Sequence, residues 1–102
     1  MDHREAAFFQ TECNKRGVRI YPVNYYSSLI LEIEFNRSPN FEIFSQQQII
    51  RGESRYEPKG TEWIEKLRAK YEEIYNTRIK PRLDKGNEVL PGSLRPVYKK
   101  AN

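Results

Sequence analysis

Residues 29 to 35 read Leu-Ile-Leu-Glu-Ile-Glu-Phe, and this stretch decides the fold. Large apolar side chains occupy every odd position from Leu29 to Phe35, whereas both glutamates, Glu32 and Glu34, stand at even positions. A period of two is that of a β-strand, in which successive side chains point to opposite faces of the sheet. We therefore predict a strand with one face in a core and the other largely in water.

Two further strands are predicted beside this one. The preceding segment, Val18-Arg19-Ile20-Tyr21, is rich in β-branched and aromatic residues, and Pro22 predicts that it ends there or lies at a sheet edge. The following segment, residues 36 to 40, has strong turn chemistry. A third strand is predicted from Phe41 to about Ile50, with a helical turn around its three glutamines as the alternative.

A helix is predicted before the strands, at residues 3 to 16. Asp2 and Glu5 have the spacing of a capping box, in which each side chain binds an amide of the other residue. Apolar residues then recur every three to four positions, and two cations precede Gly17, a typical left-handed stop.

A second, stronger helix is predicted after the loop at residues 51 to 60. Thr61 is expected to cap it, and its apolar residues from Trp63 to Ile79 form one wide stripe. Pro81 is expected to end or kink this helix, because proline disfavours helical geometry at the residue before it.

The order helix, three strands, helix predicts an α+β domain over residues 1–85. Short turns between strands favour a three-stranded antiparallel meander, and packing both helices on it buries one face. Residues 86–102 contain two prolines, two glycines and three cations, and we expect a flexible, largely disordered basic tail.

The composition limits the class of protein. A chain of 102 residues is the usual size of one domain. It contains no apolar run long enough to span a membrane and no signal-peptide pattern, so we expect a cytoplasmic protein without a membrane partner. The net charge of +4 arises at the C-terminal end, where residues 78–102 hold seven cations and two acids.

Few residues offer catalytic chemistry, so we predict no enzyme, no cofactor and no metal site. Cys13 falls on the apolar stripe of the first helix, and His3 lies in its first turn. Glu32 and Glu34 share a strand face, which leaves a metal-dependent nuclease as a less favoured hypothesis. The simpler interpretation is a solvated sheet face, with Arg19 or Arg37 as cross-strand partners.

The surplus of tyrosines and the basic C-terminal quarter indicate binding to a macromolecule. Our leading hypothesis is a small non-catalytic binding or regulatory protein whose partner is another protein, and the alternative is a nucleic-acid-binding protein. A second copy of the chain is a further candidate partner. The candidate partner-binding residues are three tyrosines expected in loops and six cations: Tyr25, Tyr26, Tyr56, Arg78, Lys80, Arg82, Lys85, Lys99 and Lys100.

Overall fold

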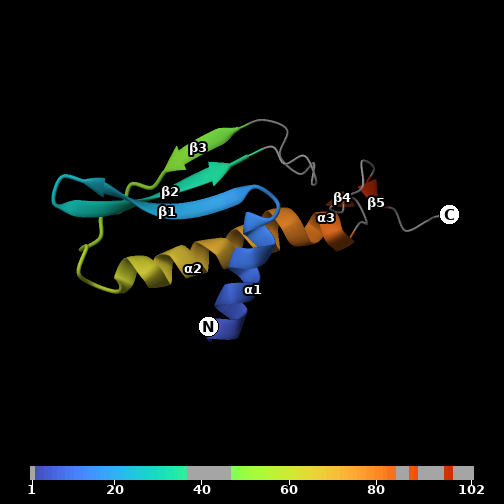
Figure 1. The fold of residues 1–102 in the computed structure, drawn as a ribbon, viewed down its shortest axis with the longest axis horizontal. Helices are drawn as coiled ribbons and strands as arrows, with labels where there is room; N and C mark the ends of the chain where they lie inside the picture. Colours follow the sequence, from blue (N-terminus) through green and yellow to red (C-terminus); the bar gives the residue numbers. More distant parts are fainter. Residues whose placement is uncertain (1, 37–46, 85–87, 90–95, 98–102) are drawn as a thin grey trace.

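The computed structural model describes residues 2–36, 47–84, 88–89 and 96–97, and it confirms the predicted α+β class and element order (Figure 1). The elements in chain order are α1 (His3–Asn14), β1 (Val18–Tyr25), β2 (Ser28–Phe35), β3 (Gln48–Arg51), α2 (Glu62–Ile74), a π-helical turn η1 (Tyr75–Ile79), α3 (Lys80–Asp84), β4 (Glu88–Val89) and β5 (Pro96–Val97).

The first three strands form an antiparallel meander in the order β1-β2-β3. β1 is an edge strand, as one of the two predicted alternatives had it, and it extends four residues beyond Tyr21. It runs through Pro22, which pairs in register with Leu31. The backbone groups of Ile20 point away from β2, because they bind the hydroxyl of Tyr71 instead. Pro22 is two residues from Ile20, so its backbone groups point in the same direction, away from β2. Its missing N–H therefore falls on the outer edge, where a proline costs no sheet hydrogen bond.

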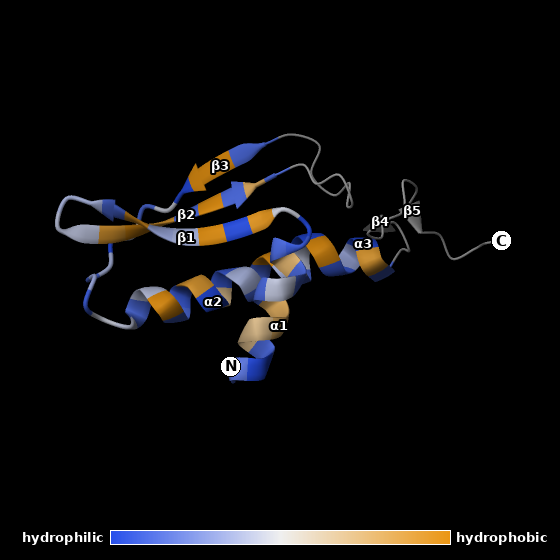
Figure 2. Ribbon diagram, viewed as in Figure 1, coloured by the Kyte–Doolittle hydropathy of each residue, from blue (hydrophilic) through white to orange (hydrophobic). Residues whose placement is uncertain are grey.

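Both long helices lie on one face of the sheet, with α1 crossing α2 (Figures 1 and 2). The odd residues of β2, predicted to face a core, pair with even residues of β1 and point toward the helices. They pack against the apolar stripe of α2 and η1. The buried cluster comprises Cys13, Val18, Ile20, Leu31, Phe35, Tyr71, Ile74 and Ile79.

The start and end of α1 follow the predicted signals. Asp2 and Glu5 form the capping box, with the Asp2 carboxylate accepting a 2.8 Å hydrogen bond from the Glu5 amide. Gly17 adopts a φ of 93°, and a Cβ there would lie 2.2 Å from the carbonyl oxygen of Asn36. The Asn36 amide donates to the Gly17 carbonyl at 2.8 Å, so this glycine permits the close passage of the chain from α1 into the sheet.

The second helix differs from the prediction at both ends. Thr61 occupies the N-cap position, but its side chain makes no capping hydrogen bond. Pro81 does not end the helix, because the chain first widens into η1 and then continues as α3 to Asp84. Within η1 the amide of Lys80 donates to the carbonyl of Tyr75, five residues earlier. A π-turn changes the hydrogen-bond spacing just before a residue that has no amide hydrogen to donate.

Only part of the third strand and of the tail can be compared with the prediction. β3 covers Gln48–Arg51, whereas residues 41 to 46 of the predicted strand lie outside the described residues. Within the predicted tail, β4 and β5 pair with each other as a two-stranded ladder. The rest of residues 86–102 also lies outside the described part of the chain.

The hydroxyl of Tyr71 joins three elements at the centre of the core. It accepts a 2.9 Å hydrogen bond from the amide of Ile20 in β1 and lies 3.0 Å from the side-chain oxygen of Asn14 in α1. In the same region the Cys13 thiol donates to the carbonyl of Tyr71 at 3.5 Å. Because Tyr71 is 2% exposed, no water replaces these bonds if the hydroxyl is removed.

We predict that Tyr71→Phe lowers the free energy of unfolding by about 1–3 kcal/mol, since it leaves the buried amide of Ile20 without an acceptor. Urea denaturation should show a lower midpoint with an unchanged slope. Tyr26→Phe is the matched control, because Tyr26 is 92% exposed, and it should leave the midpoint unchanged. Equal midpoints for the two variants would contradict the role of the Tyr71 hydroxyl.

Candidate partner-binding site

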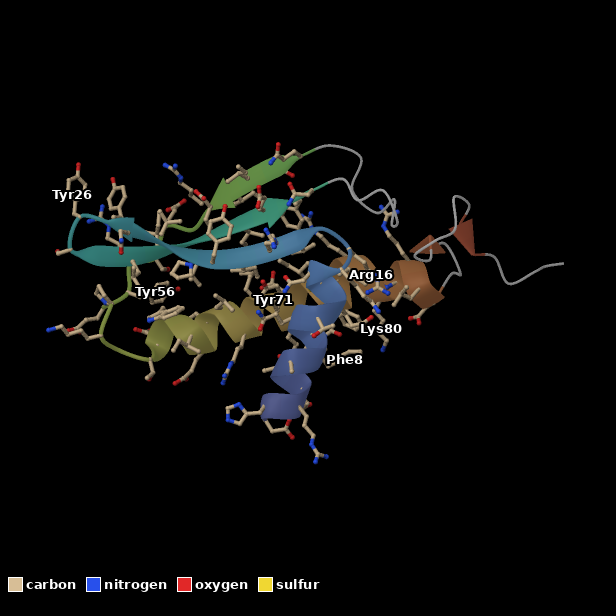
Figure 3. The ribbon with its side chains drawn as sticks, in the orientation of Figure 1. Phe8, Arg16, Tyr26, Tyr56, Tyr71 and Lys80 are labelled. Atoms are coloured by element: carbon tan, nitrogen blue, oxygen red, sulfur yellow. The ribbon has the colours of Figure 1, made fainter. Side chains whose placement is uncertain are left out.

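The turn between β1 and β2 gathers exposed aromatic surface at one end of the sheet (Figure 3). Tyr25 is the last residue of β1 rather than a loop residue, and Tyr26 follows it in the two-residue turn. Their ring centroids lie 4.9 Å apart, with the planes at 90°. Two of the tyrosines that the sequence offered as candidate partner-binding residues are therefore in direct contact in the structure.

Tyr26 stands in an unusual backbone conformation. Its φ is 56°, and it is the one non-glycine residue with positive φ in the part of the chain that the structure describes. This left-handed region costs an ordinary L-residue roughly 1–2 kcal/mol and favours glycine or asparagine. The side chain is 92% exposed, and its ring contact is the one with neighbouring Tyr25. Strained residues of this kind cluster at functional sites.

Arg55 completes this surface from the segment that follows β3. Its guanidinium carbon lies 4.8 Å from the centre of the Tyr25 ring, in a cation–π contact. Next to it is a hollow of about 370 Å³, lined by Tyr25, Ile30, Arg51, Gly52, Glu53 and Arg55. We call Tyr25, Tyr26 and Arg55 the hairpin platform. Arg55 was missed because its loop has no periodic pattern, and only the fold brings it beside Tyr25.

The face of the sheet away from the helices carries an ordered carboxylate. Glu32 is 8% exposed, although this face was predicted to lie largely in water. Its carboxylate accepts a 2.8 Å bond from the Arg51 guanidinium and a 2.9 Å bond from the Tyr21 hydroxyl. The ion-pair partner of Glu32 is therefore Arg51, whereas Arg19 stands opposite Glu34 in the β1–β2 register, and Arg37 lies outside the described residues.

This arrangement bears on the hypothesis of a metal-dependent nuclease. Glu34 lies on the same face as Glu32, and one of its carboxylate oxygens accepts a 3.1 Å hydrogen bond from the side-chain amide of Gln47. Within the described ranges, no group of three or more histidine, cysteine or acidic residues is arranged to hold a metal ion. A cation bound at Glu32 would first have to displace Arg51.

The ion pair between Glu32 and Arg51 predicts a specific acid sensitivity. Hydrogen bonds from Arg51 and Tyr21 hold the pKa of Glu32 below its ordinary value. Protons therefore bind the unfolded chain more readily, and the stabilisation is fully present above the ordinary glutamate pKa, about 4.3. It is lost as the pH falls through the lower pKa of the folded state. We expect the thermal midpoint of the wild type to fall more steeply below pH 5 than that of Glu32→Gln.

Thermal unfolding from pH 7 to pH 3 provides the measurement. Glu53→Gln is the control, because Glu53 is exposed and makes no ion pair with the described residues, and its profile should follow the wild type. Parallel profiles for the wild type and Glu32→Gln would show that this carboxylate contributes nothing to the acid sensitivity.

The predicted basic residues lie away from the hairpin platform. Lys80 and Tyr26 stand at opposite ends of the described structure (Figure 3). Arg78, Lys80 and Arg82 are exposed, and the guanidinium of Arg78 covers the Phe35 ring at 4.8 Å. Lys85, Lys99 and Lys100 lie outside the described residues. The structure therefore does not bring the described candidate residues together into one surface.

Tyr56 belongs to the protein interior rather than to an exposed loop. It forms an isolated bridge with Leu29, in which each amide donates to the other carbonyl at 2.8 Å. The half-buried ring packs against the core between the sheet and α2 (Figure 3). It also lines a hollow of about 390 Å³, together with Leu31, Ile33, Gly52, Glu53, Ser54, Lys66, Ala69, Lys70 and Glu73.

The two remaining candidates for catalysis lie apart from the hairpin platform. His3 is exposed at the first residue of α1. Cys13 is fully buried between α1 and α2, and burial raises the pKa of its thiol to about 12. A thiol with that pKa is almost entirely protonated at neutral pH and is a poor nucleophile.

We expect native Cys13 to resist alkylation by iodoacetamide at pH 8, because only about one thiol in ten thousand is ionised four units below its pKa of about 12. Intact-mass spectrometry should detect labelling only after unfolding in urea. A Ser27→Cys variant, with the new thiol in the exposed hairpin turn, should label rapidly under native conditions. Rapid labelling of the wild type would show that α1 opens readily.

Comparisons with known proteins give no functional guide. No protein-family model, curated protein or solved structure matches the chain. In the described ranges, every helix is too short or too polar to cross a membrane.

Proposed function

We propose that this chain is a small non-catalytic binding protein that recognises another protein through its hairpin platform. The observation that carries the proposal is the conformation of Tyr26. A bulky ring is held in solvent at a position where glycine would relieve backbone strain. A binding partner that covers the ring explains why a tyrosine is useful there.

The chemistry of the platform fits a protein partner. Tyrosine and arginine are enriched among the residues that dominate the energy of protein interfaces. The rigid aromatic rings lose little conformational entropy on binding, and the Tyr25–Arg55 contact already restrains both side chains. The hollow beside them, with apolar Ile30 in its lining, offers a place for a partner side chain.

The charge around the platform favours a protein over a nucleic acid. Arg51 is paired with Glu32, and Glu53 lines the same hollow as Arg55. Affinity for a polyphosphate backbone depends on several cations that neutralise phosphates together. Lys80, one of the cations on which the nucleic-acid-binding alternative depends, lies at the opposite end of the described structure from Tyr26 (Figure 3).

The proposed place of action is the cytoplasm. The chain has one cysteine, so it has no internal disulfide to form in an oxidising compartment. Cys13 contributes to the core as a small buried side chain.

The test separates binding from stability at one position. Asparagine tolerates the left-handed conformation, so Tyr26→Asn should unfold at the same or a higher temperature than the wild type. The same variant should bind the partner about 30-fold more weakly, the loss expected for an interface residue worth ~2 kcal/mol. The partner is identified by affinity capture from a lysate of the source cells, and its affinity is then measured by titration calorimetry.

A matched control and two contrary outcomes complete the test. Lys59→Ala changes another exposed residue, in the loop between β3 and α2 that carries Arg55, and should leave binding unchanged. Equal binding by the wild type and Tyr26→Asn would refute the platform as the site. Retained material that is released by nuclease and lost in Lys80→Ala and Arg82→Ala would instead favour the nucleic-acid-binding alternative.

A further inference from the structure

The two edges of the β1-β2-β3 sheet differ in how much of their backbone is available. On the β1 edge, the Tyr71 hydroxyl occupies the outward groups of Ile20, and Pro22 has no amide hydrogen to offer. These two residues close the middle of that edge. A further strand therefore has little to pair with along β1.

The β3 edge is open among the described residues. The amide of Gly52 donates to the carbonyl of Leu31 at 2.8 Å. This bond shows that the backbone groups of the even-numbered residues of β3 point toward β2. Ile50 and Gln48 then bond inward to β2, and the backbone groups of Ile49 and Arg51 point outward. Within residues 2–36 and 47–84, no other strand pairs with that side of β3.

The side chains of β3 also leave this edge unprotected. Natural edge strands are commonly guarded by lysine, proline or a bulge. Here Ile49 is 52% exposed on the outer face and Ile50 is 37% exposed on the helix face. The one charged residue of the strand, Arg51, is drawn back over its own sheet by the 2.8 Å bond to Glu32.

We propose that β3 pairs antiparallel with β3 of a second copy of this chain, which joins two three-stranded sheets into one of six strands. A two-fold axis beside Ile50 places this residue opposite its own copy. The outward groups of Ile49 then bond those of Arg51 in the other chain. Such a contact is isologous, so one surface satisfies both subunits.

Side-chain chemistry favours this register over the one that pairs the two arginines. The Ile50 pair is a non-hydrogen-bonded one, in which opposed side chains approach most closely, so two exposed isoleucines cover each other. Arg51 faces Ile49 of the other copy and not a second Arg51. Moving the register by two residues in one direction places the two arginines opposite each other, which like charges disfavour.

The surface next to Ile50, on the side of the sheet that faces the helices, favours a second copy of the chain as the partner of the β3 edge. Ile33, the partner of Ile50 in β2, lines the hollow of about 390 Å³ between the sheet and α2. The rim of this hollow carries two lysines and two glutamates, Lys66, Lys70, Glu53 and Glu73, so it has no excess of one charge. A rim with equal numbers of positive and negative side chains, next to the exposed isoleucines of β3, suits a second copy of the same surface better than a strongly charged partner.

Sedimentation equilibrium of the full chain tests the proposal. The wild type should show a species of twice the 12.2 kDa chain mass, with a fraction that rises with concentration. Ile50→Lys should weaken dimerisation by about a hundredfold or more, because it places two cations face to face at the axis. Gln10→Lys adds the same charge on exposed α1 and should dimerise like the wild type.

Cross-linking tests the register even if Ile50→Lys folds poorly. Ile50→Cys should form a disulfide-linked dimer on mild oxidation, whereas Ile49→Cys should not, because residue 49 faces residue 51 of the other copy. Buried Cys13 does not compete for the new thiol. A wild type that stays at 12.2 kDa at every concentration, or cross-linking of Ile49→Cys in preference to Ile50→Cys, would overturn the proposal.

Discussion

The buried hydroxyl of Tyr71 is the interaction on which the arrangement of this domain depends. A single oxygen contacts the edge of β1 through Ile20 and the last turn of α1 through Asn14. The sheet and both long helices are thereby fixed to one another at a buried point, where a missing partner costs more than a typical hydrogen bond contributes. Apolar packing is non-directional and does not by itself fix the relative orientation of these elements. The hydrogen bonds of the hydroxyl are directional and fix that orientation.

The same hydroxyl gives the sheet two unlike edges. By binding the outward groups of Ile20, it closes the β1 edge and places the helices against that side of the sheet. Among the described residues, β3 then remains with its outward backbone groups open and isoleucines on both faces. The proposed pairing with a second copy is thus a consequence of how the core is assembled. The proposed protein-binding platform lies on another part of the molecule, at the β1–β2 turn.

The face of the sheet away from the helices carries a hydrogen-bonded polar cluster, and the adjoining β1–β2 turn carries an exposed tyrosine in a strained conformation. Glu32, Tyr21 and Arg51 satisfy one another there and stabilise the sheet. At the turn, the two-residue connection accounts for the positive φ of Tyr26, but it favours glycine or asparagine there and not an exposed aromatic ring. The contrast between a satisfied polar cluster and an exposed, strained aromatic residue distinguishes a structural feature from a candidate recognition site.

The sequence by itself determined the α+β class, the order of the elements and the inward face of β2, because alternation and helical periodicity are local properties. It also predicted the capping box at Asp2. Only the tertiary structure decided that Pro22 lies within a strand, that Arg51 pairs with Glu32 and that Arg55 covers Tyr25. These contacts join residues distant in the chain, and their geometry depends on register and packing, which no local pattern encodes.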